Sequence, residues 1–292
     1  MHPIYSHPDV ATIIRLALDE DLRGADDITC RCLVPESARL VGVIRAKQTG
    51  VLCGLPLLAP VFAACGGGVE VSGLAADGAQ VASGDIVARF VGPARTLLTG
   101  ERTALNLAQR LSGTATQTRR LVDAVAGTRA RILDTRKTTP GLRVLQKHAV
   151  LCGGGANHRH GLHDAVLIKE NHIALMPPGP HGSGPAEAVR RARAVVGSGV
   201  SIEVEIEHLA DLAPVIAAGA DIVLLDNMAP DLLRAAVAER DRLGARCLLE
   251  ASGGITLSSV RAVAETGVER ISTGSMTHSV EALDLSMRCE AG

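Results

Sequence analysis

Hydrophobic residues follow two different patterns along this 292-residue chain, one before about residue 100 and the other after about residue 130. Residues 8–22 (PDVATIIRLALDEDL) carry apolar side chains at helical spacing behind a proline, which predicts an α-helix. Shorter alternating runs such as VGVIRA follow, separated by Asp-Gly and Ser-Gly-Asp turns. This first part therefore predicts a small antiparallel sheet accompanied by a helix.

A long helical pattern covers residues 99–126, and we expect an interruption near Ser112 and Gly113 because glycine weakens a helix. From about residue 130 onward, six apolar strand patterns alternate with amphipathic helical patterns: RARILD, DAVLIKE, SIEVEIE, ADIVLLD, RCLLEA and VERIST. This alternation predicts a parallel sheet covered by helices, and six successive units favour an α/β barrel over an open sheet. The segment 176–185 (MPPGPHGSGP) is expected to be an exposed loop.

Composition narrows the class of protein. The chain has 30 basic and 31 acidic residues, so no overall field attracts it to nucleic acid or to an anionic membrane. One Tyr, two Phe and no Trp leave few platforms for base stacking. No long uncharged apolar run and no secretory pattern is present, and the seven cysteines are scattered. We expect a cytoplasmic protein with reduced thiols and without a nucleic-acid or membrane partner.

Charged and small polar residues recur where the predicted barrel strands end. Glu203 and Glu205 alternate with apolar residues, so both carboxylates lie on one face of their strand. The carboxyl ends of barrel strands are where active sites form. The stretches ASGGI (251–255) and STGS (272–275) follow the last two strands, and their glycines let backbone N–H groups approach an anion closely. The sequence thus predicts a phosphate site at this end.

Positive charge is concentrated between Arg136 and Lys169, where six Lys or Arg residues and four His accompany one acid, Asp164. Cys152 and the nearby histidines (CGGGANHRHGLH) raise the alternative of zinc, but a structural zinc site favours tighter pairing such as CxxC with HxxxH. A solvated basic face is the other alternative. The cations flank two apolar strands and would repel one another, which favours a bound ligand with several carboxylates or phosphates.

The acids Glu203, Glu205 and Asp226 follow on later strands without nearby cations in the sequence. Such carboxylates hold Mg²⁺ together with substrate phosphates, or stabilise a developing positive charge. A polyanion, Mg²⁺ and a cationic transition state together indicate transfer from a phosphorylated sugar as diphosphate leaves.

Several segments resemble the quinolinate phosphoribosyltransferase family, also called carboxylating nicotinate-nucleotide diphosphorylase. They include ERTALNLAQRLSGTAT, DTRKTTPGLR, CGGGANHRHGLHDAVLIKENHI, IEVEIE, VLLDNM, LEASGGI and ISTGSMTHS. The resemblance covers nearly the whole chain. It implies an N-terminal α/β sandwich domain (1–113) and an incomplete, roughly seven-stranded α/β barrel (114–275), with the tail 276–292 packing back near the first domain. It also implies that quinolinate and phosphoribosyl diphosphate give nicotinate mononucleotide, diphosphate and CO2 with Mg²⁺, in NAD biosynthesis.

The same resemblance implies roles for individual residues. Arg136, Lys137, His158 and Arg159 would bind the quinolinate carboxylates, and Lys169 would lie near the diphosphate or the ring. Glu203 and Asp226 would serve Mg²⁺ and the ribose, and the catalytic set would be Lys137, Lys169, Glu203 and Asp226. The phosphate would be held by Ser252, Gly253, Gly254, Thr273, Gly274 and His278. Glu101 and Arg102 would reach the site of a neighbouring subunit, which implies a homodimer or a hexamer with shared active sites.

Three departures from the family pattern leave the expected anion ligands intact: His148 where tyrosine is common, a longer 176–185 loop and an altered turn at RGADD. Rival hypotheses are the family's molybdenum-utilisation homologue, a nicotinate phosphoribosyltransferase, a Schiff-base aldolase using Lys169, and an effector-binding barrel without activity. An aldolase would want an apolar pocket around its lysine, whereas Lys169 lies among cations. A protein that only binds anions would not need Glu203 and Asp226.

Overall fold

The computed structural model describes residues 2–291 and divides the chain into two compact units. The first contains residues 1–119, 138–154 and 276–292, and the second contains residues 120–137 and 155–275. The predicted division between residues 113 and 114 falls inside helix α4 (Ala94–Ala124), and residues 138–154 return to the first unit after the chain has entered the second.

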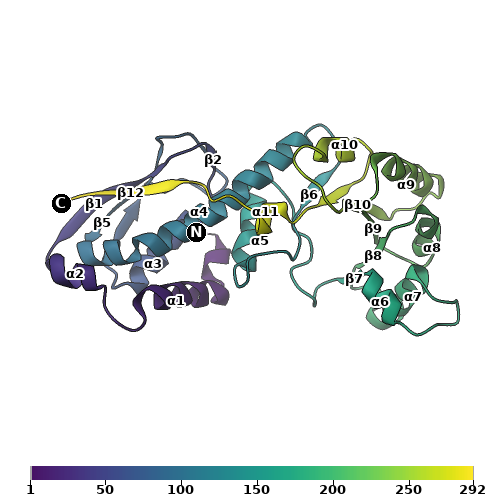
Figure 1. Cartoon of the computed structure of the whole chain (residues 1–292), viewed down its shortest axis with the longest axis horizontal. Helices are drawn as coiled ribbons and strands as arrows, with labels where there is room; N and C mark the ends of the chain where they lie inside the picture. The colour runs from purple at the N-terminus through teal and green to yellow at the C-terminus, as the bar shows by residue number, and fades with distance from the viewer. Residues whose placement is uncertain (1, 292) are drawn as a thin grey trace. The chain divides into compact units, whose positions relative to one another are not determined.

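The first unit is built on an antiparallel four-stranded sheet in the order β12-β1-β5-β3, as the alternating pattern predicts. Figure 1 shows β12, at the C-terminus, beside β1. The strands are β1 (Arg39–Ala46), β3 (Glu70–Ser72), β5 (Ile86–Pro93) and β12 (Leu285–Ala291), and β2 (Gly50–Val51) pairs with β4 (Gln80–Val81). The other elements are η1 (Pro3–Ser6), α1 (Pro8–Leu22), α2 (Ile28–Leu33), η2 (Leu55–Leu57), α3 (Leu58–Ala64), α5 (Arg143–Cys152), α11 (Ser275–His278) and the first part of α4.

Helix α1 has the predicted bounds. Pro8 occupies its first turn, where a missing N–H costs nothing, and Arg23 ends it in the left-handed conformation. Val10, Ile14 and Leu18, spaced four residues apart, form its buried face and join a core that includes Phe62.

The predicted break in the long helix is wrong, because α4 runs without interruption through Ser112 and Gly113. The buried Ser112 hydroxyl accepts from the Cys53 N–H at 3.0 Å, so it is satisfied outside the helix. A Cβ at Gly113 would collide with the backbone of Glu281. Tertiary packing thus explains why two weak helix formers occupy a helix interior.

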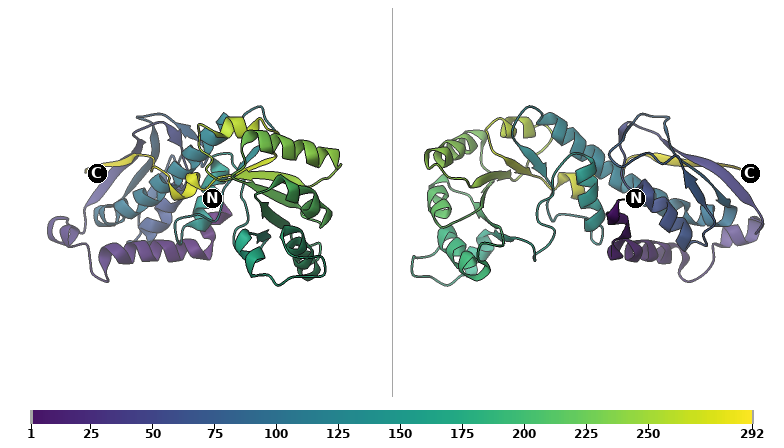
Figure 2. Two further views of the ribbon diagram at one scale, coloured as in Figure 1. Left: turned by 45° about the vertical axis from the view of Figure 1, so that its right-hand side comes forward. Right: turned by 180° about the vertical axis from the view of Figure 1, so that it is seen from behind.

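The second unit contains all six strands that the sequence predicts, in one parallel sheet of order β6-β11-β10-β9-β8-β7. The strands are β6 (Arg131–Leu133), β7 (Val166–Ile168), β8 (Ile202–Ile206), β9 (Ile222–Asp226), β10 (Leu248–Ser252) and β11 (Arg270–Ser272). The connecting elements are α6 (Glu170–Leu175), α7 (Pro185–Val196), η3 (Leu209–Asp211), α8 (Leu212–Ala217), α9 (Pro230–Arg242) and α10 (Val260–Ala264). Figure 2 shows helices outside the strands of this unit, as in an incomplete α/β barrel.

The segment 156–165 spans the gap between the two edge strands. Ala156 forms a parallel bridge with Leu133 of β6, and Arg159 donates to the carbonyl of Ala165, just before β7, at 3.1 Å. The seventh strand position of the barrel is therefore reduced to a single bridge. The part of the cation-rich segment that contains His158 and Arg159 lies where a regular strand is missing.

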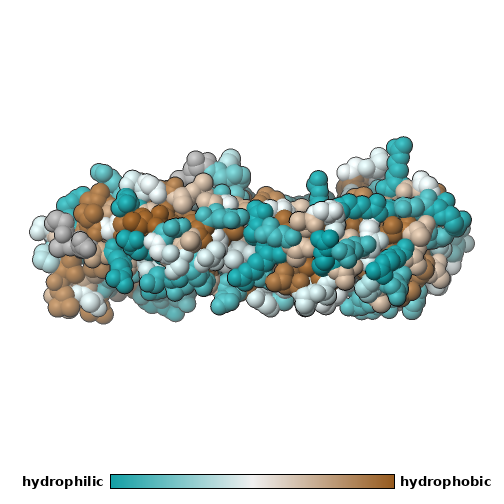
Figure 3. Space-filling model, turned by 90° about the horizontal axis from the view of Figure 1, so that it is seen from above, coloured by the Kyte–Doolittle hydropathy of each residue, from teal (hydrophilic) through white to brown (hydrophobic). Residues whose placement is uncertain are grey.

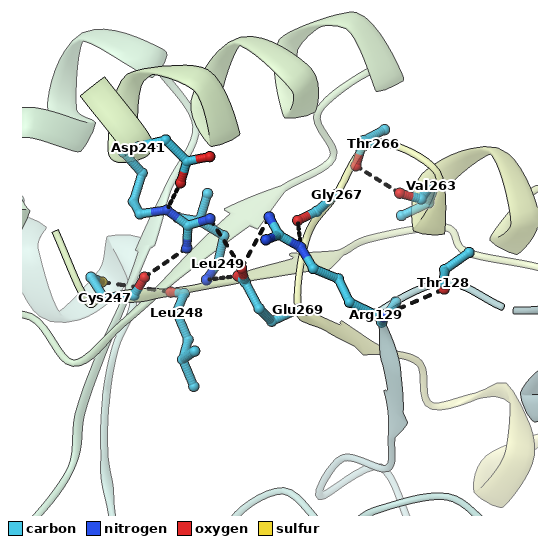
Figure 4. A network of polar contacts seen from close by, with 12 residues as sticks. Thr128, Arg129, Asp241, Cys247, Leu248, Leu249, Val263, Thr266, Gly267 and Glu269 are labelled. Atoms are coloured by element: carbon cyan, nitrogen blue, oxygen red, sulfur yellow. Dashed lines mark hydrogen bonds and ion pairs between the residues drawn. The ribbon is translucent and has the colours of Figure 1, made fainter. Parts of the chain in front are cut away.

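An ion-pair network lies at the amino ends of β10 and β11. Figure 4 shows Glu269, which precedes β11, facing Arg129, and these side chains are 3.1 Å apart. Glu269 also accepts from Arg240 at 3.0 Å and from the backbone N–H of Leu249 at 3.0 Å. Arg240 donates further to Asp241 and to the Cys247 carbonyl. Each charge here has partners within the unit.

On the face drawn in Figure 3, hydrophobic residues form separate patches among hydrophilic ones. Within residues 2–291, none of the helices combines the length and the hydrophobicity that crossing a bilayer requires.

Candidate active site

A cavity of about 300 Å³ opens at the carboxyl ends of the barrel strands, as the positions of the polar residues predict. It is lined by Thr135, Arg136, Lys137, His158, Arg159, Leu167, Lys169, Leu224, Glu250, Ser252 and Ser272. The sequence predicted substrate contacts for five residues of the cation-rich segment, and all five line the cavity. Four are Lys or Arg, so the cavity concentrates positive charge.

Arg136 and Arg159 lie close enough to repel each other. Burial, together with this repulsion, lowers the pKa of Arg159 from its usual value. Like charges side by side are stabilised by a shared anion, and guanidinium groups bind carboxylates through paired hydrogen bonds. The geometry therefore suits a ligand with more than one carboxylate or phosphate.

His158 is held between two buried acids. Its Nε2 lies 2.9 Å from Glu203 and 3.4 Å from Glu250, while its Nδ1 accepts the backbone N–H of Arg159 at 2.7 Å. Burial lowers the pKa of His158, but the two carboxylates outweigh this effect and raise it to about 9. When Nδ1 is protonated, it can no longer accept the hydrogen bond from the Arg159 N–H. The protonation of His158 is therefore coupled to the backbone conformation at Arg159.

Glu203 and Glu250 are almost inaccessible, at 3% and 0% exposure. Burial raises the pKa of Glu203, whereas His158 and Arg270 outweigh burial at Glu250 and lower its pKa. Arg270 donates to Glu250 at 2.7 Å. Oε1 of Glu203 is buried and accepts no hydrogen bond from residues 2–291. Glu203 therefore contacts His158 through one carboxylate oxygen, while burial raises its pKa.

Strand register separates Glu203 from Asp226. Glu203 lies beside Ile222 and Glu205 beside Leu224, so Asp226 is four residues beyond Glu203 but only two beyond Glu205. At roughly 3.3 Å per residue these offsets are about 13 Å and 7 Å along the strands. The register therefore places Glu205 nearer than Glu203 to Asp226 along the strands, and the Mg²⁺ ligands expected from the sequence, Glu203 and Asp226, stay a prediction.

Glu205 and Asp226 are both half-buried oxygen donors of the kind that Mg²⁺ prefers. Glu205 forms an ion pair with Lys169, and Asp226 accepts from Asn227 at 2.7 Å. Sequence reasoning grouped Glu205 with Glu203 and Asp226 as possible Mg²⁺ carboxylates but left it out of the expected metal ligands, because alternation alone does not give depth in a barrel.

The glycine loops lie next to this end of the sheet. Ser252 pairs in register with Asp226, and its hydroxyl accepts from Ser272 at 3.1 Å. Gly253 has φ +94°, and a Cβ there would collide with Asn227. Glycine is thus required at 253 both by conformation and by close approach. Thr273 is buried and donates to the carbonyl of Ile255 at 3.2 Å, and Gly274 follows it.

Three expected substrate-binding residues belong to the first unit: the half-buried Glu101 and exposed Arg102 on α4, and the exposed His278 on α11. Arg143 and Lys147, which had no assigned role, also belong there, on α5. Among the cavity-lining residues, sequence reasoning gave no role to Thr135, Leu167, Leu224, Glu250 and Ser272. Glu250 and Ser272 carried a usable signal, since both are polar residues near strand ends.

Comparisons with known proteins agree with this geometry. Two family profiles match, "Quinolinate phosphoribosyl transferase, C-terminal domain" over residues 114–288 and the corresponding N-terminal domain over residues 27–112. The chain belongs to the quinolinate phosphoribosyltransferase family.

Among its relatives, the probable carboxylating nicotinate-nucleotide pyrophosphorylase of Bacillus subtilis is 43% identical, over 92% of this chain and 89% of that protein. The carboxylating nicotinate-nucleotide pyrophosphorylase of Mycobacterium leprae is 42% identical, over 94% of this chain and 95% of that protein. A solved nicotinate-nucleotide pyrophosphorylase from Francisella tularensis is 38% identical, with a TM-score of 0.88 over 97% of this chain and 98% of that one. Both domains of the family are therefore represented in this chain.

Proposed function

We propose that the protein transfers a phosphoribosyl group from phosphoribosyl diphosphate to quinolinate with loss of CO2, giving nicotinate mononucleotide and diphosphate for NAD biosynthesis. It would thus be a decarboxylating glycosyltransferase. The cation-lined cavity carries this proposal, because a ligand with two carboxylates explains why Arg136 and Arg159 lie together. The names of the relatives favour this reaction over the molybdenum-utilisation homologue.

Quinolinate would bind through its carboxylates to Arg136, Lys137 and Arg159, with His158 beside them. Lys169, paired with Glu205, also lines the cavity and would face the diphosphate. Nicotinate, with a single carboxylate, would leave part of this positive charge uncompensated. The cavity therefore favours the dicarboxylate.

Phosphoribosyl diphosphate would place its 5-phosphate at Ser252, Gly253, Gly254, Thr273 and Gly274. Asp226 and Glu205 would hold Mg²⁺, which when bound would neutralise part of the diphosphate charge. Glu205 and Asp226 would also face positive charge that develops on the ribose as diphosphate leaves.

Decarboxylation needs little further chemistry from the protein. Ribosylation makes the ring nitrogen positive, and this charge stabilises the carbanion that remains when the 2-carboxylate is lost as CO2. The residues have to hold that carboxylate next to the nitrogen and exclude water. Arg136, Lys137 and Arg159 would supply this positioning.

We further propose a homodimer or a hexamer, in which Glu101 and Arg102 complete the site of a neighbouring subunit, in the cytoplasm. An exposed arginine on α4 is available for such a contact. Arg102→Ala with intact quaternary structure should then lose activity. Activity should return when it is mixed with Arg136→Ala subunits, because one site of the hybrid has both arginines.

The direct test is to incubate the protein with quinolinate, phosphoribosyl diphosphate and Mg²⁺ and to measure nicotinate mononucleotide and CO2 together. Equal amounts of the two products are expected. The proposal is overturned if quinolinate gives no product, and product from nicotinate alone would indicate the non-carboxylating reaction.

The magnesium ligands can be tested with two matched variants of β8. Glu205→Gln should raise the Mg²⁺ concentration for half-maximal activity by at least about 10-fold, because one charged ligand is lost. Glu203→Gln removes the same charge two residues away and should leave this concentration nearly unchanged. If Glu203→Gln raised this Mg²⁺ concentration more than Glu205→Gln did, Glu203 would be the metal ligand.

A further inference from the structure

A second cluster of chemically reactive side chains lies in the first unit. The ligand atoms of Cys53, Asp77, His148 and Cys152 all lie within 4.8 Å of one another. These residues come from the segment after β2, from the loop between β3 and β4, and from one face of α5, where His148 and Cys152 are four residues apart. Two thiols, an imidazole and a carboxylate meeting at one point are a zinc-type ligand set.

The distances inside the cluster are close to those around a tetrahedral ion. Bonds of 2.0–2.3 Å place tetrahedral ligand atoms about 3.3 to 3.8 Å apart. Nε2 of His148 is 3.5 Å from Sγ of Cys152 and 3.0 Å from the nearer carboxylate oxygen of Asp77. Only small shifts would be needed to admit a metal.

The orientation of His148 separates this cluster from a nucleophilic triad. In a triad, one ring nitrogen faces the acid and the other faces the nucleophile. Here the same nitrogen, Nε2, faces both Asp77 and Cys152, so the ring cannot relay a proton between them. Nε2 of His148 instead faces the thiol and the carboxylate together. Metal ligands have this arrangement, because all of them point toward the same ion.

Outer contacts that would orient the ligands are also present. The free carboxylate oxygen of Asp77 accepts the backbone N–H of Gly54 at 3.0 Å, and the oxygen facing His148 accepts the hydroxyl of Tyr5 at 2.6 Å. Metal sites commonly fix their carboxylates in this way. Cys53 is fully buried, whereas Cys152 and Asp77 are partly accessible and leave a route of entry.

We propose that Cys53, Asp77, His148 and Cys152 form a binding site for a thiophilic divalent cation such as Zn²⁺. With four protein ligands the site is closed and structural. It ties α5 to the segments that contain Cys53 and Asp77, and through Tyr5 it also fixes η1. This differs from the zinc alternative raised by the sequence, since Cys152 is grouped with His148 and not with His158, His160 or His163.

The test uses the full-length protein, stripped with EDTA and titrated with Co²⁺ as a spectroscopic substitute for zinc. One equivalent per chain should bind and give sulfur-to-cobalt charge-transfer bands and the visible bands of tetrahedral cobalt. Cys152→Ser and His148→Gln keep hydrogen-bonding groups but lose a ligand. They should lower the affinity by more than the about 100-fold seen for outer contacts.

Two control variants locate the signal. Cys65→Ser removes a thiol of the same unit that lies outside the cluster and should keep the full cobalt spectrum. Glu203→Gln alters the other potential ligand group, His158–Glu203–Glu250, and should keep it as well. Folding is compared by thermal unfolding in EDTA, where wild type and variants should unfold at similar temperatures. Zn²⁺ should then raise the Tm only of proteins with all four ligands.

Three results would overturn the proposal. The first is a wild-type spectrum without charge-transfer bands, and the second is an undiminished spectrum in both Cys152→Ser and His148→Gln. The third is a count of five titratable thiols, in place of the seven in the sequence, in protein purified and denatured without reductant. Peptide mapping would then have to assign the missing pair to Cys53 and Cys152, as a disulfide between these two ligands.

Discussion

The two ends of the barrel strands use the same residue types to opposite effect. At the amino ends, Glu269 forms ion pairs with Arg129 (Figure 4) and with Arg240, and it also accepts a hydrogen bond from the backbone N–H of Leu249. At the carboxyl ends, Arg136 and Arg159 repel each other, and a buried oxygen of Glu203 has no hydrogen-bond donor within residues 2–291. One end is stabilised by its own ion pairs, whereas the proposed substrates would supply the anions at the other. This difference separates stabilising residues from binding residues.

The largest effect should come from the buried acid at the carboxyl ends. Glu250→Gln leaves Arg270 and His158 with less compensating charge and should cost about 3 to 5 kcal/mol of unfolding free energy. Urea unfolding measures this loss. Glu239→Gln, which removes an exposed ion pair on α9, serves as a control and should not shift the midpoint. Wild-type stability in Glu250→Gln would show that the acid is protonated in the native protein.

Arg136→Ala and Arg159→Ala should each weaken quinolinate binding by about 30- to 160-fold, because each loses a charge-assisted hydrogen bond of about 2 to 3 kcal/mol. Phosphoribosyl diphosphate binding should change much less. Calorimetry with each substrate measures both constants, and Arg234→Ala on α9 is the matched control. Equal losses for the two substrates would refute the role assigned to these arginines.

Glu269→Gln, at the amino ends, should lower stability without changing substrate binding. It weakens contacts to Arg129 and Arg240 and should cost about 1 to 3 kcal/mol of stability while leaving quinolinate affinity unchanged. Urea unfolding and calorimetry on the same preparation give both values. A large change in quinolinate affinity would mean that the two ends are not independent.

The smallest effect concerns pH. Because the pKa of His158 is raised to about 9, above roughly 6.5 for an unperturbed histidine, its stabilising charge is complete below about 6.5 and is lost as pH rises through about 9. If the cation contributes to quinolinate binding, affinity should fall about 10-fold by pH 10.

Wild type and His158→Gln are compared at each pH, and only the wild type should show the decline. An affinity independent of pH would indicate a neutral His158 whose Nδ1 keeps the Arg159 N–H.

Local pattern was enough to predict all six barrel strands, the bounds of α1 and the cation-rich side of the cavity. Hydrophobic periodicity and strand-end position are properties of neighbouring residues, so they can be read along the chain. The family resemblance added the expected reaction and its residues.

Contacts between distant residues decided the rest. Gly113 stays helical because Glu281 packs against it, and Glu205 is nearer than Glu203 to Asp226 because strand register sets depth in the barrel. Cys53, Asp77 and Cys152 converge although many residues separate them, and no spacing in the sequence indicates this. The sequence by itself determined which elements form and where charge gathers. Only the tertiary structure decided which charges meet, because that depends on register and packing.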